Sequence, residues 1–76
     1  MSNTAGPKWG QVYETKVGLF AHNNDDTSLT LVERGSHVWF DQTHNGGYVF
    51  FCFAPHTKYW LSIPGDYLEE QLTLIT

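Results

Sequence analysis

The chain has few cysteines and few positive charges. Cys52 is the single cysteine among 76 residues, so the sequence has no internal disulfide, no CxxC pair and no thiolate-rich zinc motif. Four basic side chains stand against eight acidic ones, which gives a net charge of -4. The bases are scattered, whereas nucleic acids and anionic membranes are bound through clustered lysine and arginine, so we expect neither as a partner.

Long apolar runs are also missing from the sequence. No segment is long enough to span a bilayer, and no basic-then-apolar signal segment follows Met1. If Met1 is the native start, these two features predict a cytoplasmic protein.

Aromatic residues, in contrast, are abundant. Five Phe, four Tyr and three Trp make up 16% of the chain. A domain of this length buries only about 60% of its unfolded surface, and each aromatic side chain can bury about 150–250 Å². We therefore expect one small folded domain whose core is built largely from aromatic rings.

The β-prone residues fall into short segments separated by turns. Residues 1–10 have no period and predict a flexible N-terminal arm, followed by one domain over residues 11–76. The expected strands are residues 11–20 with a bulge at Gly18, then 29–32, 37–40, 48–53, 59–63 and 72–75. Five or six short strands with frequent turns are typical of a small all-β barrel or sandwich.

Two turns have clear local signals. Asn45-Gly46 lies between two aromatic segments and favours a type I′ hairpin turn, because both central residues of that turn need a positive φ. Pro64-Gly65-Asp66 predicts a tight turn near the C-terminus, with a helical turn over residues 66–71.

No pattern in the sequence indicates catalysis, a metal site or a cofactor. The four histidines do not have the spacing of metal ligands on a strand or a helix. Asp25 and Asp26 do not belong to a calcium-binding loop, since the spacing of such a loop and its later glutamate are missing. Cys52 lies between two phenylalanines, and an apolar environment raises the pKa of a thiol, so we expect a buried structural cysteine. The chain is therefore predicted not to be an enzyme.

Trp39, Tyr59 and Trp60 cannot all enter one small core. Strand alternation places Val38 and Phe40 on one face and Trp39 on the other. Three interpretations stay open at this point. The N-terminal arm could cover Trp39 with Trp9, a second copy of the chain could cover these rings, or they could form an aromatic recognition surface.

Several short motifs resemble those of Src homology 3 (SH3) domains. "IPGDYLEE" (63–70) resembles the Pro-x-Asn-Tyr 3₁₀ turn near the end of that family, with Asp66 in place of Asn. "HNGGYVFF" (44–51), "LTLVERGSHV" (29–38) and "GLFAHNNDD" (18–26) resemble its hairpin turn, its Leu-Ser-Phe-x-x-Gly-Asp segment and its Ala-Leu-Tyr-Asp-Tyr motif. The likeness covers residues 17–72 and extends to bacterial SH3-type domains.

The resemblance implies an SH3-like barrel with a 3₁₀ turn before its last strand, and a groove that binds extended peptides through aromatic side chains. When the groove positions of the family are transferred to this sequence one by one, the implied ligand-binding residues are Phe20, Tyr48, Pro64 and Tyr67, with Asp25 and Asp26 as an acidic rim. The chain departs from the family where His22 replaces a tyrosine and Tyr48 a tryptophan.

The sequence therefore predicts a non-catalytic interaction module that binds a peptide or protein surface. A small homo-oligomeric structural or accessory protein is the alternative, and a bacterial cell-wall-binding module is a further one. Type II dihydrofolate reductases use a similar barrel, but residues 59–62 do not match their Val-Gln-Ile-Tyr motif.

Overall fold

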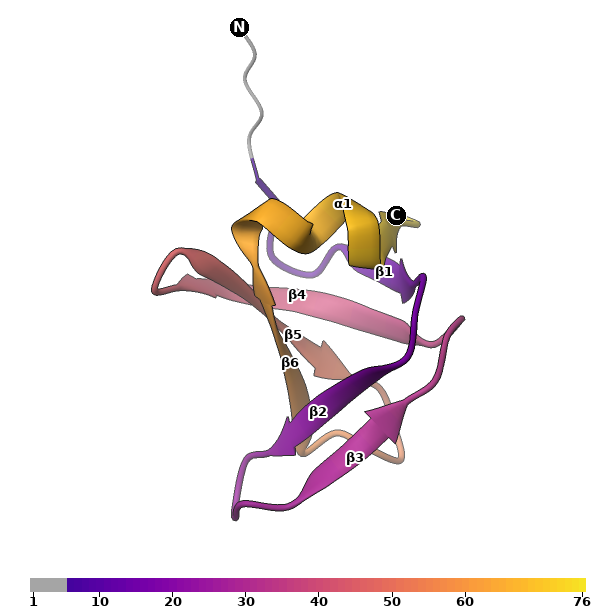
Figure 1. The fold of residues 1–76 in the computed structure, drawn as a ribbon, viewed down its shortest axis with the longest axis vertical. Helices are drawn as coiled ribbons and strands as arrows, with labels where there is room; N and C mark the ends of the chain where they lie inside the picture. Colours follow the sequence, from indigo (N-terminus) through magenta and orange to yellow (C-terminus); the bar gives the residue numbers. More distant parts are fainter. Residues whose placement is uncertain (1–5) are drawn as a thin grey trace, which may run out of the picture.

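The computed structural model describes residues 6–76, so residues 1–5 of the predicted arm lie outside the described part of the chain. The fold is all-β, as predicted: seven antiparallel strands form one curled sheet with the shape of a half-barrel (Figure 1). The strands are β1 (Val12–Thr15), β2 (Leu19–Asn23), β3 (Leu29–Val32), β4 (His37–His44), β5 (Gly47–Cys52), β6 (Tyr59–Pro64) and β7 (Leu72–Leu74). Their order across the sheet is β3-β2-β6-β5-β4-β1-β7.

The strand count of seven exceeds the expected five or six because the segment 11–20 is not one strand. The chain leaves the sheet after Thr15 and returns at Leu19. The amide of Lys16 donates to the carbonyl of Gln71 at 2.8 Å, which continues the β1–β7 register by one residue before the chain turns towards β2. As a result β1 pairs with β4 and β7, whereas β2 pairs with β3 and β6. The predicted bulge at Gly18 is instead part of this connection.

The predicted Asn-Gly hairpin is confirmed. Asn45 has a φ of 50° and Gly46 a φ of 78°, and His44 faces Gly47 across the turn. Positive φ at both central residues is the requirement of a type I′ turn. This turn joins β4 to β5, the central strand of the sheet.

The core lies on the concave face of the sheet. Phe50 on β5 is fully buried and makes edge-to-face contacts with Tyr13 and Phe40, at ring-centroid distances of 5.1 and 5.5 Å. Leu61 and Ile63 on β6 are 1% and 2% exposed. Aromatic rings therefore supply much of the core, as the composition predicts.

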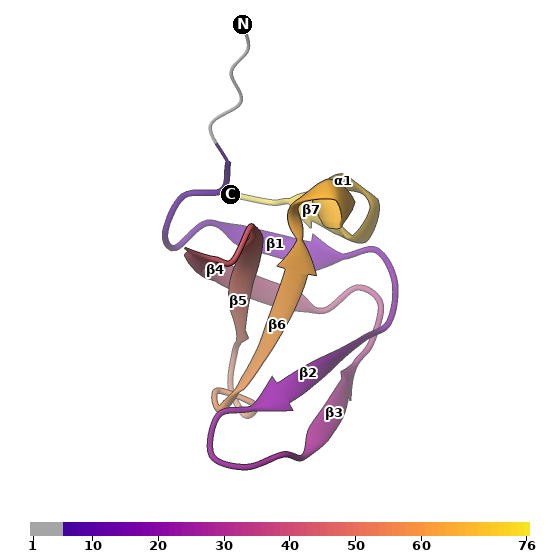
Figure 2. The same cartoon turned by 60° about the vertical axis from the view of Figure 1, so that its left-hand side comes forward.

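A short helical segment precedes the last strand, as predicted. The 3₁₀ helix η1 (Gly65–Tyr67) follows Pro64, and the single-turn helix α1 (Leu68–Gln71) leads into β7. Strand β7 then pairs with β1, so the two ends of the described chain lie side by side (Figure 2). This segment and β1 lie at one end of the molecule, and the β2–β3 hairpin lies at the other.

Candidate functional site

Tyr48 and the turn that begins at Pro64 lie together at the η1 end of the molecule. They border a hollow of about 510 Å³ whose walls include Tyr48, Gly65 and Asp66. A β-carbon at Gly65 would lie 3.9 Å from Cε2 of Tyr48, so the turn packs directly on the tyrosine ring. Pro64 and Tyr67, the residues that bracket this turn, are both exposed. Of the six predicted ligand-binding residues, Tyr48 lines the hollow, whereas Pro64 and Tyr67 flank the lining residues Gly65 and Asp66 in the chain without lining it themselves.

The N-terminal segment forms another wall of the same hollow. A β-carbon at Gly6 would lie only 3.0 Å from the hydroxyl of Tyr48, and Pro7 and Lys8 continue the wall. Two hydrogen bonds hold this segment in place: Gln11 N–H donates to the Lys8 carbonyl at 3.0 Å, and Lys8 N–H donates to Oε1 of Gln11 at 2.8 Å. The arm therefore limits access to Tyr48 from one side.

The hollow has an apolar floor and an acidic rim. Its floor includes Tyr13 and Leu72, both buried. Burial raises the pKa of Tyr13, and nearby Tyr48 raises it further, so the Tyr13 hydroxyl stays protonated at neutral pH. Asp66 and Glu69 are exposed at the rim. Such a surface suits an apolar group next to a positive charge, and its lining contains no nucleophile paired with a base.

The other three predicted residues lie elsewhere. Phe20 is 66% exposed on β2, where it faces Leu31 of β3. Asp25 and Asp26 are in the β2–β3 loop, at the end of the molecule opposite η1 (Figure 1). None of the three borders the hollow at Tyr48.

The β2–β3 loop is held by local polar contacts. Asp25 forms an ion pair of 2.9 Å with Lys58, which raises the pKa of that lysine. The carboxylate of Asp26 accepts the Ser28 N–H at 2.8 Å, and this hydrogen bonding lowers the pKa of Asp26. Both acids are exposed. Asp25 and Asp26 therefore help to shape this loop, a role that the resemblance to SH3 domains does not include.

A row of aromatic side chains crosses the face of the sheet opposite the core. The register aligns, strand by strand, Val12, Trp39, Phe51, Trp60, His22 and Leu29. Trp39 stacks on Phe51 with ring centroids 5.5 Å apart, and Trp60 stacks on His22 at 4.7 Å.

Trp9 extends the row beyond β1. Its ring meets Trp39 edge-on at 6.1 Å, yet Trp9 is 75% exposed. The expected contact between the arm and Trp39 therefore forms, but it leaves most of Trp9 open to solvent. Alternation along the sequence predicts that Trp39 lies on this face. The alignment of Trp60 with His22 depends on the pairing of β2 with β6, two strands that are distant in the sequence, so no local pattern predicts it.

A second hollow, of about 620 Å³, lies between the β3–β4 turn and the β5–β6 loop. Its lining includes Arg34, Cys52 and Phe53. Cys52 is 6% exposed and burial raises its pKa, which confirms the prediction of a buried cysteine and keeps the thiol protonated.

Within residues 6–76, no group of three or more His, Cys, Asp or Glu side chains lies close enough to hold a metal ion. The helices of this described part are all too short to cross a membrane. Comparison of the chain with protein-family models, with curated proteins and with solved structures returns no match.

Proposed function

We propose that this chain is an SH3-like, non-catalytic interaction module that binds an extended peptide or a protein surface. Three features support the SH3-like assignment: the Asn45-Gly46 hairpin turn, the 3₁₀ helix between β6 and the last strand, and the pairing of that last strand with β1. Such modules bind ligands through aromatic side chains on a rigid β scaffold.

The observation that carries the proposal is the hollow shared by Tyr48 and the Pro64–Tyr67 turn. It combines an apolar floor with the acids Asp66 and Glu69 on its rim, and the exposed residue Tyr67 directly follows Asp66 in the chain. The lining holds these two acids and one base, Lys8, so it carries an excess of negative charge, and charge complementarity favours a peptide with an apolar residue close to a lysine or arginine. Phe20 on β2 and the two acids Asp25 and Asp26 in the β2–β3 loop do not line the hollow, so they would contact only a ligand that extends along the molecule.

A peptide-display library rich in proline, lysine and arginine, selected on the immobilised domain, tests the proposal. We expect Tyr67→Ala to lower the affinity for the selected peptides at least about tenfold, because exposed aromatic anchors dominate such interfaces. Tyr67 is 49% exposed, so the same variant should keep the thermal stability of the parent chain. Tyr48→Ala is a poor probe, since Tyr48 packs on the core and contacts Phe40 at 5.9 Å.

Phe20→Ala is the matched control, because Phe20 is an exposed aromatic on β2 that does not line the hollow. We expect its effect on binding to stay within about twofold. A library that yields no binder, or peptides that bind Tyr67→Ala as well as the parent, would reject the hollow as the binding site.

A further inference from the structure

Strand β3 (Leu29–Val32) forms one edge of the sheet and pairs on one side only, with β2. The amide of Asn23 donates to the carbonyl of Ser28 at 3.0 Å, which identifies this pair as a hydrogen-bonded one. Hydrogen-bonded and non-bonded pairs alternate along an antiparallel ladder. Thr30 therefore bonds to β2, whereas the N–H and C=O groups of Leu29 and Leu31 point away from the sheet at its open edge.

Apart from its short length of four residues, this edge lacks the features that normally prevent strand-to-strand association. Its sequence, Leu-Thr-Leu-Val, contains no charge and no proline, and its register with β2 has no bulge. Leu29 and Leu31 are 55% and 53% exposed, and Phe20, opposite Leu31, is 66% exposed. An apolar patch thus borders a row of unpaired backbone groups.

Charged residues flank β3 on both sides. Asp25 and Asp26 precede the strand, with Asp25 paired to Lys58, and Glu33 and Arg34 follow it. The side chain of Arg34 is exposed and forms no ion pair within residues 6–76. Asp26 and Arg34 lie at equal distances along the chain on either side of Thr30.

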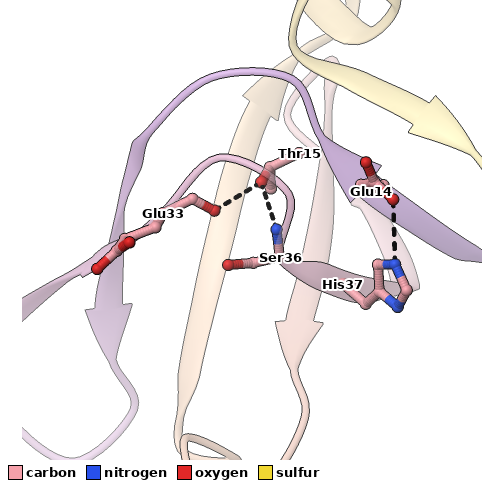
Figure 3. A network of polar contacts seen from close by, with 5 residues as sticks. All are labelled: Glu14, Thr15, Glu33, Ser36 and His37. Carbon is pink, nitrogen blue, oxygen red and sulfur yellow. Dashed lines mark hydrogen bonds and ion pairs between the residues drawn. The ribbon is translucent and has the colours of Figure 1, made fainter.

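The turn that carries Arg34 is held firmly. The buried hydroxyl of Thr15 donates to the Glu33 carbonyl at 2.9 Å and accepts the Ser36 N–H at 3.1 Å (Figure 3). The Gly35 N–H also donates to the Thr15 carbonyl at 2.8 Å. These bonds on both sides of Arg34 fix the position of its backbone relative to the end of β3.

From these observations we propose that β3 is a self-association edge, which pairs antiparallel with β3 of a second copy of this chain. The two-fold axis passes between the two Thr30 residues. Leu29 then exchanges its N–H and C=O hydrogen bonds with Leu31 of the second copy, and Leu31 does so with Leu29. The same two-fold axis brings Arg34, in the β3–β4 turn, to the side of the interface where Asp26 lies in the β2–β3 loop of the second copy, and the reverse.

This arrangement explains the exposed patch and the opposite charges together. The side chains of Leu29 and Leu31 from both copies lie next to each other on the face that also carries Phe20, and the sheet becomes continuous through both molecules. The pairing involves one short strand per copy, so its interface is well below the about 800 Å² per partner of a standard stable interface. We therefore expect a reversible dimer with a dissociation constant of about 1 µM to 1 mM.

Sedimentation velocity over a wide concentration range measures this equilibrium. Leu31→Lys places like charges across the two-fold axis, and we expect it to weaken the dimer at least about tenfold. Ile75→Lys is the matched control, because Ile75 is 48% exposed and lies just beyond β7, at the opposite edge of the sheet. The control should dimerise like the parent chain, and thermal melts should show both variants folded.

A charge-reversal pair tests the register. Arg34→Glu alone and Asp26→Arg alone each place like charges opposite one another in a homodimer, so each should dimerise about fivefold to tenfold more weakly than the parent. In a mixture of the two variants both ion pairs are restored across the interface. We expect the heterodimer, followed by energy transfer between N-terminal labels, to regain the parent affinity.

A parent chain that stays monomeric at millimolar concentration overturns the proposal. So does a dimer that Ile75→Lys disrupts and Leu31→Lys does not, since this result assigns association to the β7 edge. A mixture of the charge variants that associates no better than either variant alone rejects the Asp26–Arg34 register.

Discussion

Cys52 illustrates how the environment of one residue determines its chemistry. Its side chain is buried at the end of β5, and this burial raises the pKa of the thiol because the thiolate loses its hydration. Because the Cys52 thiol has a higher pKa in the folded state than in the unfolded chain, it contributes to the stability of the fold at pH values below the pKa of the unfolded thiol. This contribution is lost as the pH rises through the folded-state pKa.

We therefore predict that Cys52 of the native protein reacts with Ellman's reagent at pH 8 at least about tenfold more slowly than the same cysteine in denaturant. The rate should increase as the pH is raised further and the fraction of thiolate grows. Equal rates in the native and unfolded chains would show that the thiol is accessible and ionised, contrary to its position in the structure.

Tyr48 combines two positions in the fold. The resemblance indicates a ligand-contacting ring, and in the structure Tyr48 is half-buried against the core and also lines the hollow. The alternation of β5 contained the relevant signal, since Tyr48 shares a strand face with Phe50 and Cys52, both buried. The burial of Cys52, in contrast, was predictable from its two phenylalanine neighbours.

At the scale of elements, the β3–β4 turn depends on a contact from a distant strand. Thr15 is 2% exposed, and its hydroxyl bonds to both Glu33 and Ser36. We predict that Thr15→Val, which keeps the shape but removes these bonds, lowers the free energy of unfolding by about 1–2 kcal/mol, measured by urea denaturation.

Thr15→Ser is the control for this prediction, because it retains the hydroxyl and removes only the methyl group. It should lose less stability than Thr15→Val, although its cavity adds a cost of its own. If the serine variant were the less stable of the two, packing of the methyl group would outweigh the hydrogen bonds.

Most individual elements follow from local sequence. The strands from β3 to β7, the Asn45-Gly46 turn and the 3₁₀ helix begin close to their predicted positions because each depends on alternation or turn chemistry, but β4 continues to His44, four residues beyond its predicted end. The segment 11–20 was mispredicted because β-prone residues continue across its bend. The break between β1 and β2 accompanies their pairing with different strands, β4 and β7 for β1 and β3 and β6 for β2, and most of these contacts join distant parts of the chain.

At the scale of the whole molecule, strand register determines the surface that is available for binding. The aromatic row, the hollow at Tyr48 and the open β3 edge all depend on pairings between strands that are not consecutive. Composition predicts a small all-β domain with many aromatics, but it contains no information about these pairings. The candidate sites were therefore only partly predictable from the sequence.

The closure of the last strand onto the first provides a test of the fold as a whole. Leu72 on β7 is 3% exposed, belongs to the core and lies opposite Thr15 of β1. A domain of this size is stable by only about 4–11 kcal/mol, at about 0.05–0.15 kcal/mol per residue.

We predict that Leu72→Ala lowers the free energy of unfolding by about 2–5 kcal/mol, a large part of the total, because it leaves a cavity where β7 meets the core. Thr73→Ala is the matched control on the same strand, since Thr73 is exposed and faces away from the core. Its effect should stay within about 0.5 kcal/mol. Urea denaturation followed by tryptophan fluorescence measures both variants. Equal losses would mean that β7 contributes through its backbone pairing with β1 rather than through the burial of Leu72.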